Sequence, residues 1–313
     1  MNQVFLFHKI PSKEWFKNTL TTIKSIYNFV SIDDIESYYC ENKRLNYSCH
    51  ITFDDGDISV FSNAFPILKK MNIPATLFVS PKVIKNGSNY WFQELIYLEN
   101  TVGSLQIINT LSKVMKCSFK SINNFSLNSL FDSLKLKDIY RVIEEIKRKN
   151  NIECGKKFNI TKDNLLEMHS CKLITVGSHS LNHPILANEN DFDCENEIKE
   201  SILQLSKMLG EPIKYFAYPN GITGIDYNNR EKKILNENGI KLAFATNYGG
   251  FFKINTDQLG IDRTGLSRGN KALIYSKIFL GPVWELLLNL IYRGKTERNE
   301  RKSISNINVF SYK

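Results

Sequence analysis

Short apolar runs of strand length recur along the chain, and glycine, proline or acidic residues bound most of them. Between these runs lie longer stretches in which apolar residues recur with helical spacing. Strands that alternate with helices form parallel sheets with crossover helices, so the pattern predicts an α/β fold. The predicted strands cover residues 3–7, 48–53, 73–79, 173–177, 215–218 and 242–245, and the predicted helices cover 14–30, 59–71, 162–170, 195–209 and 230–238.

Repeated strand–helix units over this length favour a (β/α) barrel, in which the residues at the carboxyl ends of the strands carry the chemistry. Residues from about 87 to 160 depart from the alternation, because they are rich in Lys, Asn and Ser and mostly helical in pattern. We interpret them as a helical insertion. The predicted division is therefore a barrel over residues 1–270 and a C-terminal amphipathic helix with a basic tail over residues 271–313.

The segment 272–292 is apolar, but Lys277, Glu285 and Asn289 interrupt it too often for a membrane span. Two interpretations remain for this segment. It could lie as a helix on an anionic membrane surface, which would make peripheral membrane contact, or it could pack on the barrel with a solvated basic tail. We favour the second. The basic residues that follow the segment are Arg293, Lys295, Arg298, Arg301 and Lys302.

Composition adds limited information. Hydrophobic residues make up 42% of the chain, which is typical of a folded globular protein. The formal charge of +9 suits an anionic partner such as a phosphorylated substrate, and equally a Lys-rich solvated surface. The six cysteines form no Cys-x-x-Cys pair, which argues against a zinc ribbon or a disulfide scaffold. The first residues lack a basic segment followed by a long apolar run, so we expect a cytoplasmic protein.

Two adjacent carboxylates, Asp54 and Asp55, directly follow the predicted strand at 48–53. Consecutive strand residues point to opposite sides, so both can serve one site only if the chain turns, which Gly56 permits. Because Asp-Asp-Gly is also common in solvated turns, this pair alone leaves a turn and a site open as alternatives.

Two of the five histidines, His179 and His183, follow the predicted strand at 173–177. Imidazoles four residues apart can converge on one metal if the backbone is helical or tightly turned; the alternative is a chance surface pair. Two histidines and one carboxylate, with positions left for water, form a catalytic ligand set. We predict that His50 and His169 are structural.

A third motif, 216–221, follows the predicted strand at 215–218. Pro219 and Gly221 bracket a turn whose backbone N–H groups would point outward. Such donors can hold a developing oxyanion, although by itself the motif is only a loop.

Together, and in this order, the three motifs resemble the polysaccharide deacetylase family (NodB-homology type, carbohydrate esterase family 4). The resemblance covers roughly residues 1–265 and is weakest in the insertion. It implies a distorted (β/α) barrel of about seven strands. The segments that carry it are 52–56, 64–68, 73–78, 179–183 and 216–221.

The resemblance also implies the roles of the site residues. Asp55, His179 and His183 would bind a divalent metal, with Zn²⁺ as the default and Co²⁺, Mn²⁺ or Ni²⁺ as alternatives. Asp54 would be the general base that takes a proton from a water acidified by the cation. The backbone N–H of Asn220 would help to hold the oxyanion, and the products would be a short acid and a free amine.

The chain lacks two residues that many members of this family carry. Ala217 or a neighbour stands where many members carry an arginine that steadies the catalytic aspartate, and Arg263 is a candidate replacement. No histidine follows His183, although members often carry a late histidine that protonates the leaving amine. The segment around His8 is similar to the Tyr-His segment that opens circularly permuted members, so we predict His8 as the general acid. The alternative is a surface histidine at a strand end.

The leading hypothesis is a cytoplasmic, metal-dependent N-deacetylase acting on an amino sugar in cell-surface polysaccharide or glycan-precursor metabolism. Its partner would be an amino-sugar-containing glycan, a nucleotide sugar or a lipid-linked saccharide, and no nucleic acid. A deformylase or amidase on a non-sugar amide could use the same metal site, because selectivity lies in loops. A non-catalytic glycan- or nucleic-acid-binding protein is the alternative of another class, and the presence of Asp54 and all three ligands argues against it. The sequence leaves the oligomeric state open.

Overall fold

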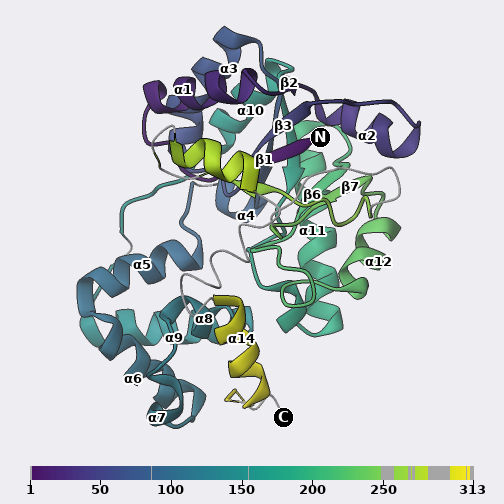
Figure 1. Ribbon diagram of the computed structural model, residues 1–313. Coiled ribbons are helices and arrows are strands. Elements are labelled where there is room, and N and C mark those ends of the chain that lie inside the picture. Colours follow the sequence, from purple (N-terminus) through teal and green to yellow (C-terminus); the bar gives the residue numbers. More distant parts are fainter. Residues whose placement is uncertain are drawn as a thin grey trace.

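A parallel β-sheet forms the centre of the computed structural model, which describes residues 2–85, 87–153, 155–247, 257–266, 269, 272–280, 297–307 and 309–310 (Figure 1). The strands run in the order β7-β6-β5-β4-β3-β1-β8, with β2 paired to the start of β3, and every pair is parallel. This confirms the predicted distorted (β/α) barrel. The strands are β1 (Gln3–Phe7), β2 (Asn28–Phe29), β3 (Ser48–Phe53), β4 (Ala75–Val79), β5 (Ile174–Ser178), β6 (Tyr215–Ala217), β7 (Leu242–Phe244) and β8 (Thr264–Gly265).

The segment 258–266, which includes β8, joins the two ends of this sheet. Ala245 N–H donates to the Ile261 carbonyl at 2.8 Å on the β7 side, and Leu266 N–H donates to the Leu6 carbonyl at 2.8 Å on the β1 side. Both outer edges are thereby paired, so the barrel closes through a short irregular segment. The pattern of apolar residues did not predict β8 or β2, because strands of two residues are too short to show an alternation.

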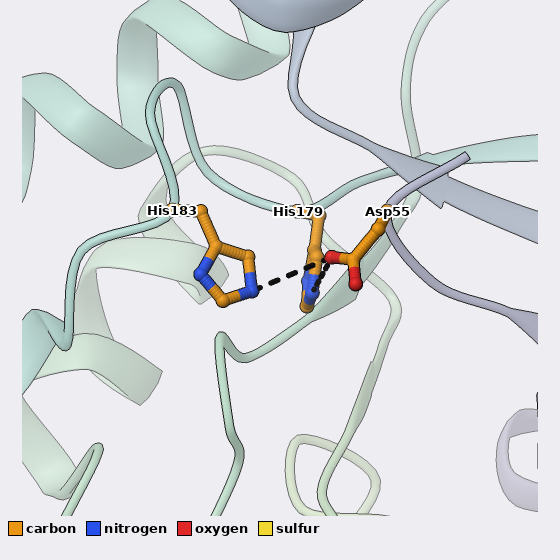
Figure 2. A group of neighbouring side chains, drawn as sticks. All are labelled: Asp55, His179 and His183. Atoms are coloured by element: carbon orange, nitrogen blue, oxygen red, sulfur yellow. Dashed lines mark ion pairs between the residues drawn. The ribbon is translucent and has the colours of Figure 1, made fainter. Parts of the chain in front are cut away.

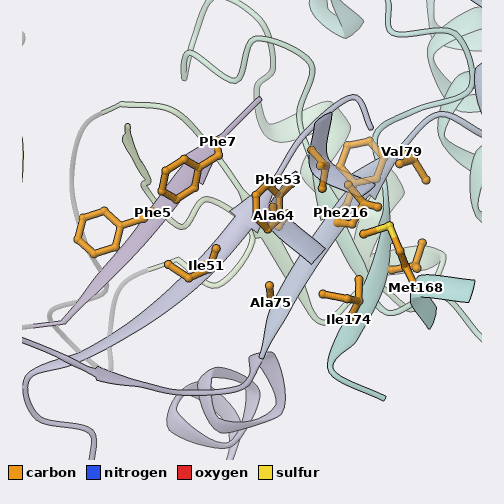
Figure 3. Close-up of a cluster of buried hydrophobic side chains, with 14 of the residues drawn as sticks. Phe5, Phe7, Ile51, Phe53, Ala64, Ala75, Val79, Met168, Ile174 and Phe216 are labelled. Atoms are coloured by element: carbon orange, nitrogen blue, oxygen red, sulfur yellow. The ribbon is translucent and has the colours of Figure 1, made fainter. Parts of the chain in front are cut away.

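Helices cover the outside of the barrel, and the main core lies between them and the strands. Figure 3 shows part of this core, including Phe5, Phe7 and Phe53. The predicted helix 14–30 is too long, because α1 ends at Lys24 and β2 follows within the predicted span. The covering elements are α1 (Lys13–Lys24), α2 (Ile32–Cys40), the π-helical turn η1 (Val60–Ala64), α3 (Phe65–Met71), α4 (Pro81–Ile84), α10 (Lys162–Ser170), η2 (Leu186–Asn188), α11 (Asp191–Leu209) and α12 (Asn229–Glu237).

The barrel interior is filled by side chains from alternate strand positions. Val4, Phe78 and Phe244 share a second cluster there, whereas Phe5 belongs to the outer core. A Cβ atom at Gly177 would lie only 2.4 Å from the Phe78 ring. Glycine at this position of β5 therefore makes room for the aromatic ring beneath the site.

A group of helices between β4 and α10 lies to one side of the barrel (Figure 1). These helices have an apolar core of their own, in which Ile304 of the C-terminal helix α14 also takes part. Their bounds are α5 (Trp91–Val102), α6 (Ser104–Met115), α7 (Phe119–Ile122), α8 (Leu127–Phe131), α9 (Leu136–Asn150) and α14 (Glu297–Asn306).

The C-terminal part of the chain is described only in pieces. Residues 272–280 are helical, and residues 281–296 of the predicted amphipathic segment lie outside the described residues. Among the described helices, none combines the length and the apolar character needed to span a membrane. The division of the chain at residue 270 stays a prediction.

Candidate metal centre and active site

Three buried side chains converge at the carboxyl ends of β3 and β5 (Figure 2). Asp55 Oδ1 lies 3.5 Å from His179 Nε2 and 3.5 Å from His183 Nε2. One ligand atom from each residue lies within 4.8 Å of the other two, which suits coordination of a single cation. The predicted ligands thus come from the ends of two strands, β3 and β5, that lie on either side of β4.

His179 is held by the sheet. Its N–H donates to the Val79 carbonyl at 3.0 Å, which continues the β4–β5 pairing by one residue. Its Nδ1 lies 2.7 Å from the Ala217 carbonyl of β6. Since a carbonyl only accepts, Nδ1 carries the proton and the Nε2 lone pair faces the site, as metal ligation requires.

Asp55 and His183 lie beyond the strands, in left-handed backbone conformations with φ of 69° and 62°. This conformation costs a non-glycine residue about 1–2 kcal/mol, so surrounding contacts must hold it. Gly56 follows at φ 77°, and a Cβ there would lie 3.1 Å from a Val79 methyl group. The tight turn predicted from Asp-Asp-Gly is therefore present.

Glu197 of α11 holds the loop between the two histidines. Its buried carboxylate accepts hydrogen bonds from Leu181 N–H at 3.1 Å and from Asn182 N–H at 2.9 Å, and from the Asn182 side-chain amide at 2.6 Å. His183 N–H donates to Ser180 Oγ at 3.0 Å within the same loop. Glu197 was not predicted, because a glutamate within a helix carries no signal of its distant partners.

The protonation states of these three side chains suit the binding of a cation. Burial lowers the pKa of His179 to about 4 and holds the pKa of His183 well below its usual value, so both imidazoles are neutral at pH 7. Burial and the neighbouring Asp54 raise the pKa of Asp55, whose buried Oδ1 has no hydrogen-bond partner among the described residues. Asp55 Oδ1 and the two neutral imidazoles therefore present lone pairs that no hydrogen bond from a described residue uses at this point. A divalent metal bound between them would use these lone pairs as ligands.

Asp54 forms a bidentate ion pair with Arg263, which reaches the barrel interior from the closing segment. Both guanidinium–carboxylate distances are 2.7 Å, and Arg263 Nε also donates to the Ala245 carbonyl at 3.1 Å. Burial opposes ionisation of Asp54, but the charge of Arg263 and its hydrogen bonds to the carboxylate prevail, so the pKa of Asp54 lies below its usual value. Arg263 therefore lies beside Asp54, as expected of a residue that replaces the arginine of other family members.

All six predicted site residues line one pocket of about 470 Å³. His8 is exposed at the end of β1; the surrounding protein lowers the pKa of its imidazole, and the Asp54 carboxylate opposes this shift. Asn220 has a left-handed backbone with φ of 56°, and its own carbonyl accepts a hydrogen bond from the Thr246 hydroxyl. No hydrogen bond engages the Asn220 N–H within the described part of the chain, which leaves this donor available. The roles of His8, Asp54 and Asn220 stay predictions.

The insertion and the C-terminal helix supply part of the pocket wall, which the sequence did not predict. Trp91, Phe92 and Ile96 come from α5, and Asp132 follows α8. Glu297 begins α14, on the same side of the pocket. These residues belong to segments without catalytic motifs, so only the folded chain shows that they border the site.

The barrel and its buried Asp-His-His set define a protein of the polysaccharide deacetylase type. The family model described as "Polysaccharide deacetylase" matches residues 42–243. The chain belongs to this family. No curated protein matches the chain.

Several solved structures share the fold. IcaB from Ammonifex degensii is 19% identical, with a TM-score of 0.57 over 90% of this chain and 97% of that one. The deacetylase PplD from Streptococcus pyogenes, solved with acetate, is 19% identical, with a TM-score of 0.55 over 84% and 91%. A de-N-acetylase from Aggregatibacter actinomycetemcomitans is 14% identical, with a TM-score of 0.55 over 87% and 98%.

Proposed function

We propose that this chain is a divalent-metal-dependent hydrolase that removes an N-acetyl group from an amino sugar of a cell-surface glycan or its precursor. The observation that carries the proposal is the buried set of Asp55, His179 and His183 directly beside the Asp54–Arg263 ion pair. The set of three side chains offers metal ligands, and the ion pair offers a fixed, ionised carboxylate. Membership of the polysaccharide deacetylase family supports the same reaction class.

The residues divide the work of amide hydrolysis between them. A divalent cation held by the three ligands would polarise the substrate carbonyl and lower the pKa of a water molecule. Asp54 accepts the proton from the attacking water, while Arg263 keeps its carboxylate ionised and fixed in orientation. The Asn220 N–H donates a hydrogen bond to the carbonyl oxygen as negative charge develops there.

The C–N bond breaks only if the leaving nitrogen gains a proton, because an amide anion is a poor leaving group. His8 lines the same pocket at the end of β1 and is exposed, so it can exchange protons with solvent. We assign His8 as the donor. The products are acetate and a free amine on the sugar.

The pocket suits the amino-sugar end of a larger molecule. Its volume of about 470 Å³ accommodates a monosaccharide, and aromatic Phe92 together with polar Asn128 and Asp132 offers an apolar surface and partners for hydroxyl groups. We propose a nucleotide sugar or a lipid-linked saccharide as substrate, met in the cytoplasm, with Zn²⁺ as the metal. The positive charge of +9 on the chain as a whole would favour a pyrophosphate that stays outside the pocket.

The test is acetate release from a panel of N-acetylated nucleotide sugars, lipid-linked saccharides and chitin fragments, with the metal-loaded protein. Acetate release should be abolished by chelation, restored by Zn²⁺ and abolished by Asp54→Asn. Equal activity on chitin fragments and on lipid-linked sugar would argue against a lipid-linked substrate. Formate release, or acid release from non-sugar amides alone, would replace the proposal with a deformylase or amidase on the same centre.

A further inference from the structure

Three consecutive aromatic residues at the start of α5 contact the metal-ligand residues. The Tyr90 hydroxyl donates to the Asp55 carbonyl at 2.9 Å, and the Trp91 indole N–H donates to the His183 carbonyl at 2.8 Å. Tyr90 and Trp91 are only 1% and 3% exposed, so both hydrogen bonds are shielded from water. The insertion therefore touches two of the three ligand residues directly.

These two ligands are the ones that the sheet does not hold. Asp55 and His183 have left-handed backbones, with φ of 69° and 62°, whereas His179 continues β5 and is fixed by β4 and β6. A carbonyl hydrogen bond fixes the orientation of the peptide that follows each left-handed residue. Tyr90 and Trp91 thus supply, for Asp55 and His183, the constraint that sheet pairing supplies for His179.

Aromatic packing also confines the His183 ring. The centroids of Tyr90 and Phe92 lie 5.4 Å and 5.0 Å from the imidazole, and the two aromatic rings stack on each other at 5.1 Å. This packing leaves His183 Nε2 facing Asp55 Oδ1 at 3.5 Å. A ring fixed in the ligating orientation loses little conformational freedom when it binds a cation.

The anchor for these contacts is the core of the insertion. Trp91 stacks on Phe131 of α8 with the ring planes 15° apart. At the other end of the insertion, Ile160 N–H donates to the Gly56 carbonyl at 2.9 Å, next to Asp55. Both ends of the insertion therefore brace the turn that carries the Asp55 ligand.

We propose that Tyr90 and Trp91 are positioning residues of the metal centre, so that the helical insertion is a structural part of the metal site. The inference rests on the metal site of the proposed function and extends it to residues outside the catalytic motifs. It predicts that metal affinity depends on hydrogen bonds from α5 and not only on the three ligands.

The test compares Tyr90→Phe and Trp91→Phe with two controls of the same kind elsewhere. Tyr215→Phe removes a hydroxyl bound to Glu36 at 2.6 Å, and Trp15→Phe removes an indole bound to the Gly269 carbonyl at 2.9 Å. The measurements are the Kd for Zn²⁺, by competition with a chromophoric chelator, and the visible absorption of the Co²⁺-substituted protein. Thermal unfolding of the metal-free variants reports any general loss of stability.

We expect each site variant to raise the Kd about tenfold and to change the Co²⁺ spectrum, as loss of a group that orients a ligand does. The control variants should keep the wild-type Kd and spectrum, even where they lower the Tm. Wild-type Kd and spectrum in folded Tyr90→Phe and Trp91→Phe would overturn the inference. Tyr90→Phe removes a single oxygen, so it tests the idea even if Trp91→Phe does not fold.

This experiment can refute the proposed function and the positioning role of Tyr90 and Trp91 separately. A weaker Kd in the site variants, in a protein that releases no acetate from any substrate, would overturn the function and support the positioning role. A wild-type protein that binds neither Zn²⁺ nor Co²⁺ would overturn both. Acetate release with identical metal affinity in all variants would overturn the positioning role alone.

Discussion

Replacing Arg263 with methionine tests whether the ion pair between Arg263 and Asp54 stabilises the folded protein. Arg263 is 1% exposed and its guanidinium makes two 2.7 Å contacts with Asp54. Methionine keeps much of the volume but leaves the Asp54 carboxylate buried without its cation. Removing one partner of a buried ion pair costs about 3–5 kcal/mol, so we expect a loss of unfolding free energy of that size.

A double-mutant cycle separates charge compensation from packing. Asp54→Asn alone leaves the Arg263 guanidinium buried and unpaired, and should also destabilise the fold. In the double variant neither charge remains, so the total loss should be about 3 kcal/mol smaller than the sum of the two single losses.

The assay is urea unfolding at pH 7 in the presence of a chelator, so that bound metal does not contribute to the measured free energy. Arg148→Met is the control, because the side chain of that arginine is 72% exposed and pairs with Glu145 at 2.9 Å on the surface of α9. Its loss should cost less than about 1 kcal/mol. Additive losses for Asp54→Asn and Arg263→Met would show that the two charges do not stabilise each other, and would refute the reasoning.

Three further predictions concern the metal and buried polar groups. Zn²⁺ at about 100 times its Kd should raise the unfolding free energy by about 2.7 kcal/mol, and an unchanged urea midpoint would exclude a specific site. Glu197→Ala should weaken Zn²⁺ binding about tenfold by removing the carboxylate that accepts from the Asn182 N–H and side-chain amide in the ligand loop, whereas Glu197→Gln should keep most of the affinity; equal Kd values for both would contradict this. Burial lowers the pKa of His50 to about 4, so the unfolded chain takes up a proton first as the pH falls below 6.5. Between pH 7 and pH 5 the wild type should therefore lose about 2 kcal/mol more stability than His50→Gln in urea unfolding, and parallel losses would argue against it.

The strand ends could be predicted from sequence because local patterns mark them. An apolar run that stops at Asp54 or His179 places each side chain at the same edge of a parallel sheet. Residues at that edge meet whatever the details of the helices between them. This is why the ligand set and the pocket-lining position of Asn220 followed from three short motifs.

The groups that hold the site could not be predicted in the same way. Arg263 lies 209 residues from Asp54, and Trp91 lies 92 residues from His183. Each pairing depends on how the closing segment or the insertion packs, which no local periodicity encodes. The Arg263 suggestion came from a missing family arginine, and nothing in the sequence marked Trp91 or Glu197 as partners of the metal-ligand loops.

The closing segment links the fold to the chemistry. Its register pairs Leu6 with Gly265, and Arg263 and Gly265 both line the pocket, whereas Thr264 between them hydrogen-bonds the Gln3 side chain instead. Because the side-chain period of a strand is two, a shift of one residue would turn the guanidinium away from Asp54. Such a shift would leave a buried carboxylate without its cation, at a cost of several kcal/mol. The ion pair that keeps the Asp54 carboxylate ionised therefore also selects the register in which the barrel closes.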